Sequence, residues 1–200
     1  MRRIKKMSGM RSQRAFTLIE LVVVLAIMSI VIGIASVSIS NAMRQARLRD
    51  ATRELQGELG TIRNRARTQQ RIVVAQMTAT SIMAFYDVNN DKVYDSAVDY
   101  IDVNNNGAFD ADVDTEGLFF QHTYTNGIQF AVTSTAAGAL APLTTFRYNA
   151  AGNIDDGNRH ITVSLNTEPL RRYRISVYTT GTTSVGRSED GGVTWPTRPW

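Results

Sequence analysis

The chain begins with a long apolar run and continues with shorter apolar runs that alternate with polar residues. Residues 21–39 contain no charged side chain. About twenty apolar residues in a helix, at about 1.5 Å each, span the hydrocarbon core of a bilayer. The sequence therefore predicts a membrane-spanning helix near the N-terminus, with one carboxylate, Glu20, at its start. Placing a charged carboxylate at the edge of a membrane span costs free energy, so an acid at this position is expected to have a function.

A second helical pattern follows from Asn41 to about Arg71, where apolar residues recur at spacings of three and four. This spacing is typical of an amphipathic helix. No proline interrupts the stretch, so we expect one continuous helix from Phe16 to about Thr68. Its arginine-rich face is interpreted as a solvated face. The apolar stripe consists of Leu48, Ala51, Leu55, Leu59, Ile62 and Ala66.

After Arg71 the pattern changes to short apolar runs with a period of two, separated by turn signals such as Asn126-Gly127. Consecutive short strands of this kind predict an antiparallel β domain. The expected fold class is therefore α+β, with a long N-terminal helix packed on an antiparallel β domain. The predicted strands are Ile72–Gln76, Ser81–Tyr86, Leu118–Tyr124, Ile128–Thr133, Thr144–Tyr148, Ile161–Leu165 and Arg172–Tyr178.

Composition and charge divide the chain into four segments. We expect a basic leader at 1–15, the transmembrane half of the helix at 16–40, its amphipathic half at 41–71, and a β-rich domain at 72–200. The leader has six basic residues and no acid, and the rest of the chain has 16 basic and 18 acidic residues. The overall charge of +4 therefore does not indicate nucleic-acid binding. The basic leader predicts a cytoplasmic N-terminus and an exported C-terminal part. The sequence has no cysteine, which excludes disulfides and thiol chemistry.

The residues Phe16-Thr17-Leu18-Ile19-Glu20, followed by a long apolar helix, resemble the processing site of type IV prepilins and pseudopilins. The resemblance implies that a prepilin peptidase cuts between Ala15 and Phe16 and so removes the leader. It also implies that the new amine of Phe16 is then N-methylated. It also implies that Glu20 acts in assembly by pairing with the Phe16 amine of its own or a neighbouring subunit. The residue before the cut is usually glycine in this family. An ordinary secretory signal peptide and a plain signal anchor are the alternatives, and neither explains Glu20.

The order of the later parts resembles the H-type minor pseudopilins of type II secretion and the related minor pilins, the GspH/FimT family. The matching residues are the helix end 62–67, the strand 72–74, the run 146–152 and the segments 161–163 and 172–187. The resemblance implies a minor pseudopilin, a structural and assembly subunit of a type II secretion pseudopilus or a type IV pilus. Its partners would be other pilins, contacted through the N-terminal helix, and an inner-membrane assembly platform. It would be a single-pass inner-membrane protein with a periplasmic C-terminal domain, later part of the fibre. A major fibre subunit is a further option.

A DNA-binding minor pilin, for DNA uptake or adhesion, is the alternative function. Members of the family implicated in DNA binding carry Gly-Arg-x-Arg near the C-terminus, whereas this chain has Gly186-Arg187-Ser188-Glu189. Arg187 is the candidate nucleic-acid contact, and the acid in place of the second arginine leads us to expect weak DNA binding or none. The two histidines, His122 and His160, lie in strand-like runs. The sequence has no phosphate loop or nucleophile motif, so we do not expect an enzyme.

The segment 87–116 is an acidic insertion with nine acids and one base. It contains an internal repeat with a shift of 15 residues, in which residues 87–95 align with 102–110. Oxygen side chains at positions one, three, five and nine are the spacing by which a loop wraps a calcium ion. The alternative is a solvated hairpin whose acids keep it soluble.

We therefore expect two calcium ions, one in each repeat. The first set of ligands is Asp87, Asn89, Asp91, the carbonyl of Val93 and Asp95. The second set is Asp102, Asn104, Asn106, the carbonyl of Ala108 and Asp110. Asp99 and Asp114, at position thirteen, are further candidates. We expect the second loop to bind more tightly, because Gly107 permits the sharp turn that Lys92 resists.

Overall fold

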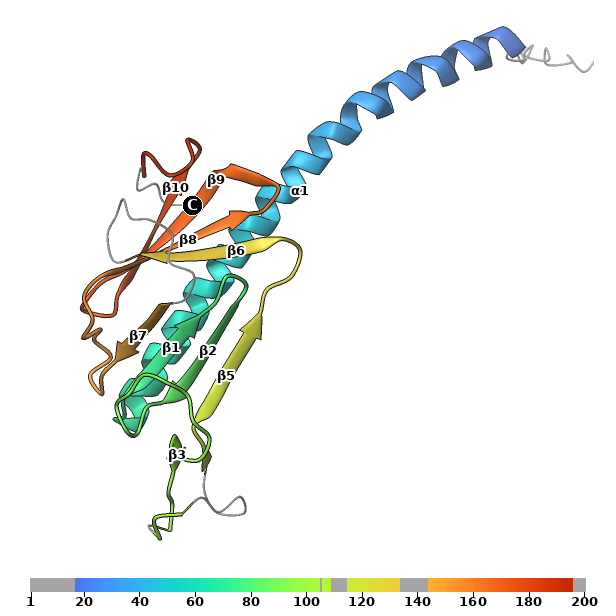
Figure 1. Ribbon diagram of the computed structural model, residues 1–200. Helices are drawn as coiled ribbons and strands as arrows, with labels where there is room; N and C mark the ends of the chain where they lie inside the picture. Colours follow the sequence, from blue (N-terminus) through green and yellow to red (C-terminus); the bar gives the residue numbers. More distant parts are fainter. Residues whose placement is uncertain (1–16, 105, 109–114, 134–143, 196–200) are drawn as a thin grey trace, which may run out of the picture. The chain divides into compact units, whose positions relative to one another are not determined.

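The computed structural model describes residues 17–104, 106–108, 115–133 and 144–195 (Figure 1). The chain forms two compact units, residues 1–44 and residues 45–200. Helix α1 (Leu18–Gln69) belongs to both units, and the strands belong to the second. The described strands are β1 (Val73–Met77), β2 (Ser81–Tyr86), β3 (Tyr100–Ile101), β4 (Thr115–Glu116), β5 (Leu118–Thr123), β6 (Ile128–Thr133), β7 (Thr144–Tyr148), β8 (Arg159–Leu165), β9 (Glu168–Val177) and β10 (Thr183–Ser188).

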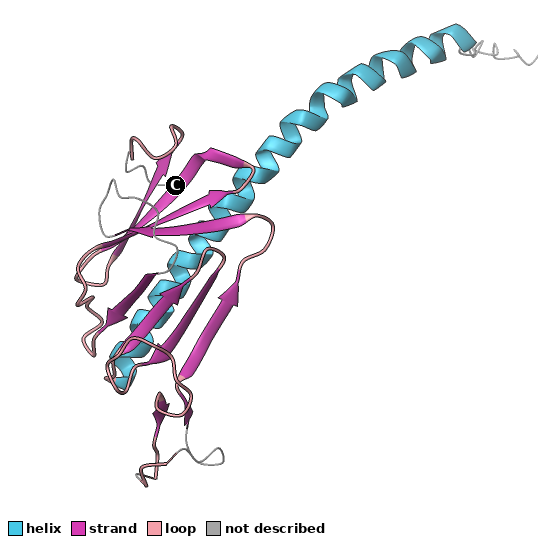
Figure 2. Cartoon of the chain, in the orientation of Figure 1, coloured by secondary structure: helices cyan, strands magenta, loops and turns pink. Residues whose placement is uncertain are grey.

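The strands of the second unit form antiparallel sheets (Figure 2). One four-stranded sheet has the order β5-β2-β1-β7, and the other has the order β10-β9-β8-β6. A separate two-stranded pair, β3-β4, lies within the acidic insertion and beyond the ends of β2 and β5 (Figure 1). Every strand pairing in the described residues is antiparallel.

The second half of α1 and the inner faces of both four-stranded sheets share one hydrophobic core. All six residues of the predicted apolar stripe are at most 6% exposed, and Leu55, Leu59 and Ile62 are fully buried. Helical spacing brings these side chains to one face, and the sheets cover that face with alternating inward residues such as Ile161 and Val163 of β8. The predicted α+β class is confirmed.

The sequence suggested that the arginine-rich face of α1 is solvated. In the structure, two of its arginines instead contact the β domain. Arg63 donates hydrogen bonds from Nε to the carbonyl of Gly152 (3.0 Å) and from Nη2 to the carbonyl of Thr180 (2.8 Å). Arg65 donates from Nε to the hydroxyl of Tyr86 (2.8 Å). These arginines therefore fix α1 against the β domain, because hydrogen bonds from a charged donor are stronger than neutral ones.

The predicted strands are present, with ends shifted by a few residues, and three further strands were not predicted. β10 has one large apolar residue, Val185, so its sequence lacks the period-two signal. It forms because it pairs along its whole length with β9. The other two, β3 and β4, are two residues long and lie in a segment dominated by acids.

Candidate functional site

The start of α1 is set by Thr17 and Glu20. The backbone N–H of Glu20 donates to Thr17 Oγ1 (3.3 Å), and the N–H of Leu21 donates to the carbonyl of Thr17 (3.2 Å). Thr17 is therefore the N-cap, and Glu20 is the third residue of the first turn. The order Thr-x-x-Glu is that of a capping box, of which the bond from the Glu20 N–H to Thr17 Oγ1 is one half.

Beyond Glu20 the helix surface is apolar and exposed. Every large apolar side chain described between Leu18 and Ile34 is at least 46% exposed. One 18-residue window of α1 has a mean hydropathy of 2.9, and by length and composition the helix is able to cross a membrane. An exposed apolar surface of this extent needs lipid or neighbouring apolar helices. The predicted processing residues Ala15 and Phe16 lie outside the described residues.

A hydrogen-bonded cluster, which the sequence analysis did not identify, joins α1 to β5. Glu58 Oε1 contacts His122 Nδ1, and the Tyr124 hydroxyl donates to Glu58 Oε2 (2.6 Å). The rings of His122 and Tyr124 are in contact, with centroids 4.3 Å apart and planes tilted by 34°. Burial, and then the hydrogen bond and charge of Glu58, raise the pKa of Tyr124 far above its ordinary value. Tyr124 therefore stays a neutral donor to the carboxylate.

The same cluster brings together ligand atoms from Glu54, Glu58 and His122 that lie within 4.8 Å of one another. Both carboxylate oxygens of Glu58 already have partners within the protein. The hydrogen bonds of Glu58 therefore join α1 to β5 and to the residue that follows it. His160 is likewise hydrogen-bonded, through Nδ1 to Ser176 Oγ (2.9 Å), as expected for a strand residue.

We predict that Glu58→Ala lowers the free energy of unfolding by about 1–3 kcal/mol, because the buried Tyr124 hydroxyl loses its acceptor. Glu58→Gln, which keeps an acceptor oxygen, should cost less. Glu54→Gln serves as the matched control, since Glu54 is exposed on the same helix and should change stability by no more than about 0.5 kcal/mol. Denaturant unfolding of the full chain in detergent measures all three. Equal losses for Glu54→Gln and Glu58→Ala would contradict the role of the cluster.

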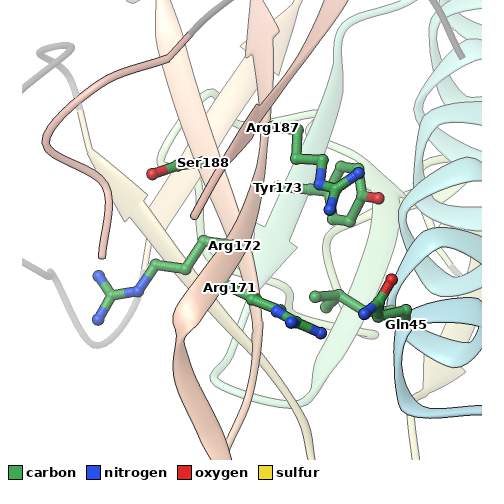
Figure 3. Close-up of a pocket in the computed structure, with 7 residues that line it drawn as sticks. Gln45, Arg171, Arg172, Tyr173, Arg187 and Ser188 are labelled. Atoms are coloured by element: carbon green, nitrogen blue, oxygen red, sulfur yellow. The ribbon is translucent and has the colours of Figure 1, made fainter. Parts of the chain in front are cut away.

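Arginines of β9 and β10 lie on two opposite faces of their sheet (Figure 3). Arg171 and Arg187 lie on the side of Gln45 and α1, whereas Arg172 extends on the other side with Ser188. The strand register agrees, since Arg187 is opposite Tyr173 and Ser188 is opposite Arg172. The cavity between β9, β10 and α1 is lined by Gln45, Leu48, Arg171, Arg172, Tyr173, Arg187 and Ser188.

The candidate nucleic-acid residue, Arg187, already has a partner. Its Nη2 contacts Glu189 Oε1, and both side chains are about half exposed. Arg174 lies over the ring of Trp195, with its guanidinium carbon 4.4 Å from the ring centroid. The arginines of β9 and β10 are therefore divided between two faces, and Arg187 forms an exposed ion pair with Glu189, the acid that replaces the second arginine of the DNA-binding pattern.

The predicted calcium ligands lie in the two loops of the acidic insertion. In the first loop Asp87 is buried, and Asn89, Asp91 and Asp95 are exposed, as is Val93. In the second loop, Asp102 is half-buried and Asn104, Asn106 and Ala108 are exposed. Asp110 and Asp114 lie outside the described residues. A second acid that the sequence placed among the further candidates, Asp99, is fully buried.

Comparisons with known proteins give one match at the N-terminus and several similarities of fold. The minor pilin FimU of Pseudomonas aeruginosa is 12% identical, with a TM-score of 0.48 over 76% of this chain and 94% of FimU. The minor pseudopilin EpsH of the Vibrio cholerae type 2 secretion system is 13% identical, with a TM-score of 0.44 over 70% of this chain and 95% of EpsH. Similarities at this level do not bear on function. None of the curated protein sequences matches the chain.

The sequence match covers residues 10–36, which include the predicted cut, the cap at Thr17 and the start of α1. Glu20 lies within it, three residues after the cap. The N-terminal segment of this chain carries the prokaryotic N-terminal methylation motif.

Proposed function

We propose that this chain is a structural subunit of a type II secretion pseudopilus or a type IV pilus. One observation carries the proposal. The methylation motif at residues 10–36 coincides with the start of a long helix whose large apolar side chains from Leu18 to Ile34 are exposed and whose first turn holds Glu20. A processing motif, an exposed apolar surface and a single carboxylate are thus combined in one segment, and each is needed by a subunit that leaves the membrane to enter a helical fibre.

The exposed apolar half of α1 has two successive partners in this proposal. Lipid covers it first, because a helix of about twenty apolar residues is stable in the hydrocarbon core. The corresponding helices of other subunits cover it in the fibre. The β domain, which is folded on the second half of α1, would remain on the exported side, since the six basic residues of the leader favour a cytoplasmic N-terminus.

A minor rather than a major subunit is the finer form of the proposal. It depends on the resemblance of the C-terminal part to H-type minor pseudopilins described above. In this form a prepilin peptidase and an inner-membrane assembly platform are the partners before assembly, and neighbouring pilins are the partners afterwards. The fold and the motif serve a pseudopilus and a pilus equally.

DNA capture is the weaker candidate function. It requires arginines gathered on one exposed face, because phosphate contacts dominate the affinity. Here Arg187 is paired with Glu189 and lies on the opposite face from Arg172. The acidic insertion adds eight net negative charges to the same unit, which repel a polyanion.

The experiment that tests the proposal is mass spectrometry of the chain isolated from membranes. We expect a mature N-terminus at Phe16 carrying the mass of one added methyl group. Ala15→Gly is the matched control and should be cut at least as completely, since glycine is the usual residue before the cut in the resembling family. A mature N-terminus near Met43 would indicate ordinary signal-peptide cleavage and would contradict the proposal.

A further inference from the structure

The acidic insertion begins with a carboxylate that the fold buries without satisfying it. Asp87 directly follows β2 and is 4% exposed. Its backbone N–H donates to the carbonyl of Ile72 (3.2 Å), which fixes it to the β domain. Its Oδ1 accepts the N–H of Asp91 (3.1 Å), but its buried Oδ2 has no hydrogen-bond partner. A buried, unpartnered carboxylate oxygen is costly, and such groups in native proteins require an explanation such as a bound ion.

A second buried carboxylate lies close to the first. Asp99 is fully buried, and it accepts the N–H of Val88 at Oδ1 (3.0 Å) and the N–H of Asp95 at Oδ2 (2.9 Å). Burial raises the pKa of Asp87 above its ordinary value, although backbone N–H groups of residues 90–92 oppose the rise, and the charge of Asp99 adds a smaller increase. Two neighbouring carboxylates in a poorly solvated place repel each other. A divalent cation between them removes the repulsion and supplies the missing partner of Asp87.

The chain between these two acids turns in the way a calcium loop does. The Asp91 N–H also lies 3.3 Å from Asn89 Oδ1, and the Val93 N–H donates to Asp91 Oδ1 (2.7 Å). Lys92, at the sixth position, has a φ of 65°, and the corresponding Gly107 of the second repeat has a φ of 80°. Both repeats therefore make the same turn, and Lys92 does not prevent it. This turn gathers the oxygens of positions one, three and five on its inner side.

The first loop is also held in place by contacts outside the insertion. The ring of Tyr94 packs on the buried ring of Phe85, with centroids 5.3 Å apart. Lys92 Nζ forms an ion pair with Asp156 Oδ1 (2.7 Å). The anchored loop loses less conformational entropy when it closes on an ion than a free loop would.

We propose that the first loop binds one calcium ion between the two buried carboxylates of Asp87 and Asp99, and that oxygens of Asn89, Asp91 and Val93 close on the ion when it binds. Asp99 takes the place expected for Asp95, whose Oδ1 instead accepts the N–H of Ala97 (2.9 Å). An all-oxygen, irregular set of ligands suits calcium better than magnesium, which demands near-octahedral geometry. We expect the first loop to bind calcium more tightly than the second, in contrast to the expectation from sequence, because the first loop holds two buried acids and the described ligands of the second are at most half-buried.

The test uses the full-length chain in detergent, with calcium chloride as the probe. We expect a heat of binding with a dissociation constant of about 10⁻³ M or tighter, and a higher melting temperature in calcium than in chelator. Asp99→Asn should weaken binding by about tenfold or more, since affinity depends on the number of charged ligands. Asp102→Asn, the corresponding change to the first ligand of the second repeat, should leave the tight site intact.

Asp87→Asn separates a calcium ligand from a merely structural acid. As a ligand, it should melt in chelator at or above the wild-type temperature, because the unpartnered charge is gone, and it should no longer respond to calcium. Lower stability in chelator with an undiminished calcium response would overturn the proposal. The proposal also fails if calcium at several millimolar causes neither heat nor a melting shift, if magnesium causes an equal shift, or if Asp102→Asn abolishes the response while Asp99→Asn leaves it.

Discussion

Glu20→Gln is expected to insert in the membrane and to be cleaved normally, yet to be lost from fibres. After cleavage, Phe16 carries a cationic amine, and Glu20 is the only acid in the first thirty residues of the mature chain. An unpaired charge in the hydrocarbon region costs about 2.5–3.5 kcal/mol on insertion scales. A subunit whose amine lacks its counter-charge should therefore enter the fibre at least about tenfold less often, since about 1.4 kcal/mol is a factor of ten. The measurement is the ratio of the variant in sheared fibres to the variant in membranes.

Two roles of the first turn have to be separated in this experiment. Glutamine retains the polar side chain of a capping box and removes only the charge. Thr17→Ala removes the cap that accepts the Glu20 N–H but leaves the carboxylate, so it should still assemble. If Glu20→Gln enters fibres normally, the charge has no part in assembly. If Thr17→Ala fails as severely as Glu20→Gln, the role of the segment is to cap the helix.

The fold was largely predictable because its main signals are local. The six residues of the apolar stripe recur at helical spacing, and all six are buried. The turn residues Asn126 and Gly127 have φ values of 60° and 78°, the left-handed conformations that an Asn-Gly turn permits. β10 was missed because its stability comes from pairing with β9 rather than from its own pattern. The period of apolar residues cannot predict a strand that is stabilised mainly by pairing with a neighbouring strand.

The contacts of the site were less predictable, because they join residues far apart in the sequence. Glu58 and His122 are in contact although they are 64 residues apart in the sequence. No sequence pattern around either residue predicts that contact. The repeat indicated which loop oxygens to consider, but not that the fold would bury Asp87 and Asp99 and leave Asp91 exposed. Burial of a carboxylate depends on the ends of β2 and β3 that hold it. Sequence spacing therefore selected the loop residues but could not show which of the two loops contains buried carboxylates.

Gly117→Ala is expected to disrupt the attachment of the acidic insertion to the β domain. Gly117 lies between β4 and β5, and its carbonyl accepts the N–H of Tyr86 (3.0 Å). A Cβ at this position would lie 1.7 Å from the carbonyl oxygen of Asp99 and 2.5 Å from its carbonyl carbon. These are backbone atoms, so the β3–β4 segment has to move. We expect a loss of about 1–3 kcal/mol in the free energy of unfolding, the usual cost of overpacking.

The same displacement moves the buried carboxylate of Asp99, so Gly117→Ala should also lose the melting shift caused by calcium. Gly57→Ala is the matched control, because a Cβ there meets nothing within 4 Å and the position is in the middle of α1. Alanine in a helix interior is favoured over glycine by about 0.8–1 kcal/mol, so this variant should be slightly more stable and keep its calcium response. Thermal melting of the full chain in calcium and in chelator compares the two. If Gly117→Ala keeps both its stability and its calcium response, as Gly57→Ala should, then the close approach of Asp99 to Gly117 does not hold the insertion in place. That result would contradict a rigid position for the carboxylate of Asp99.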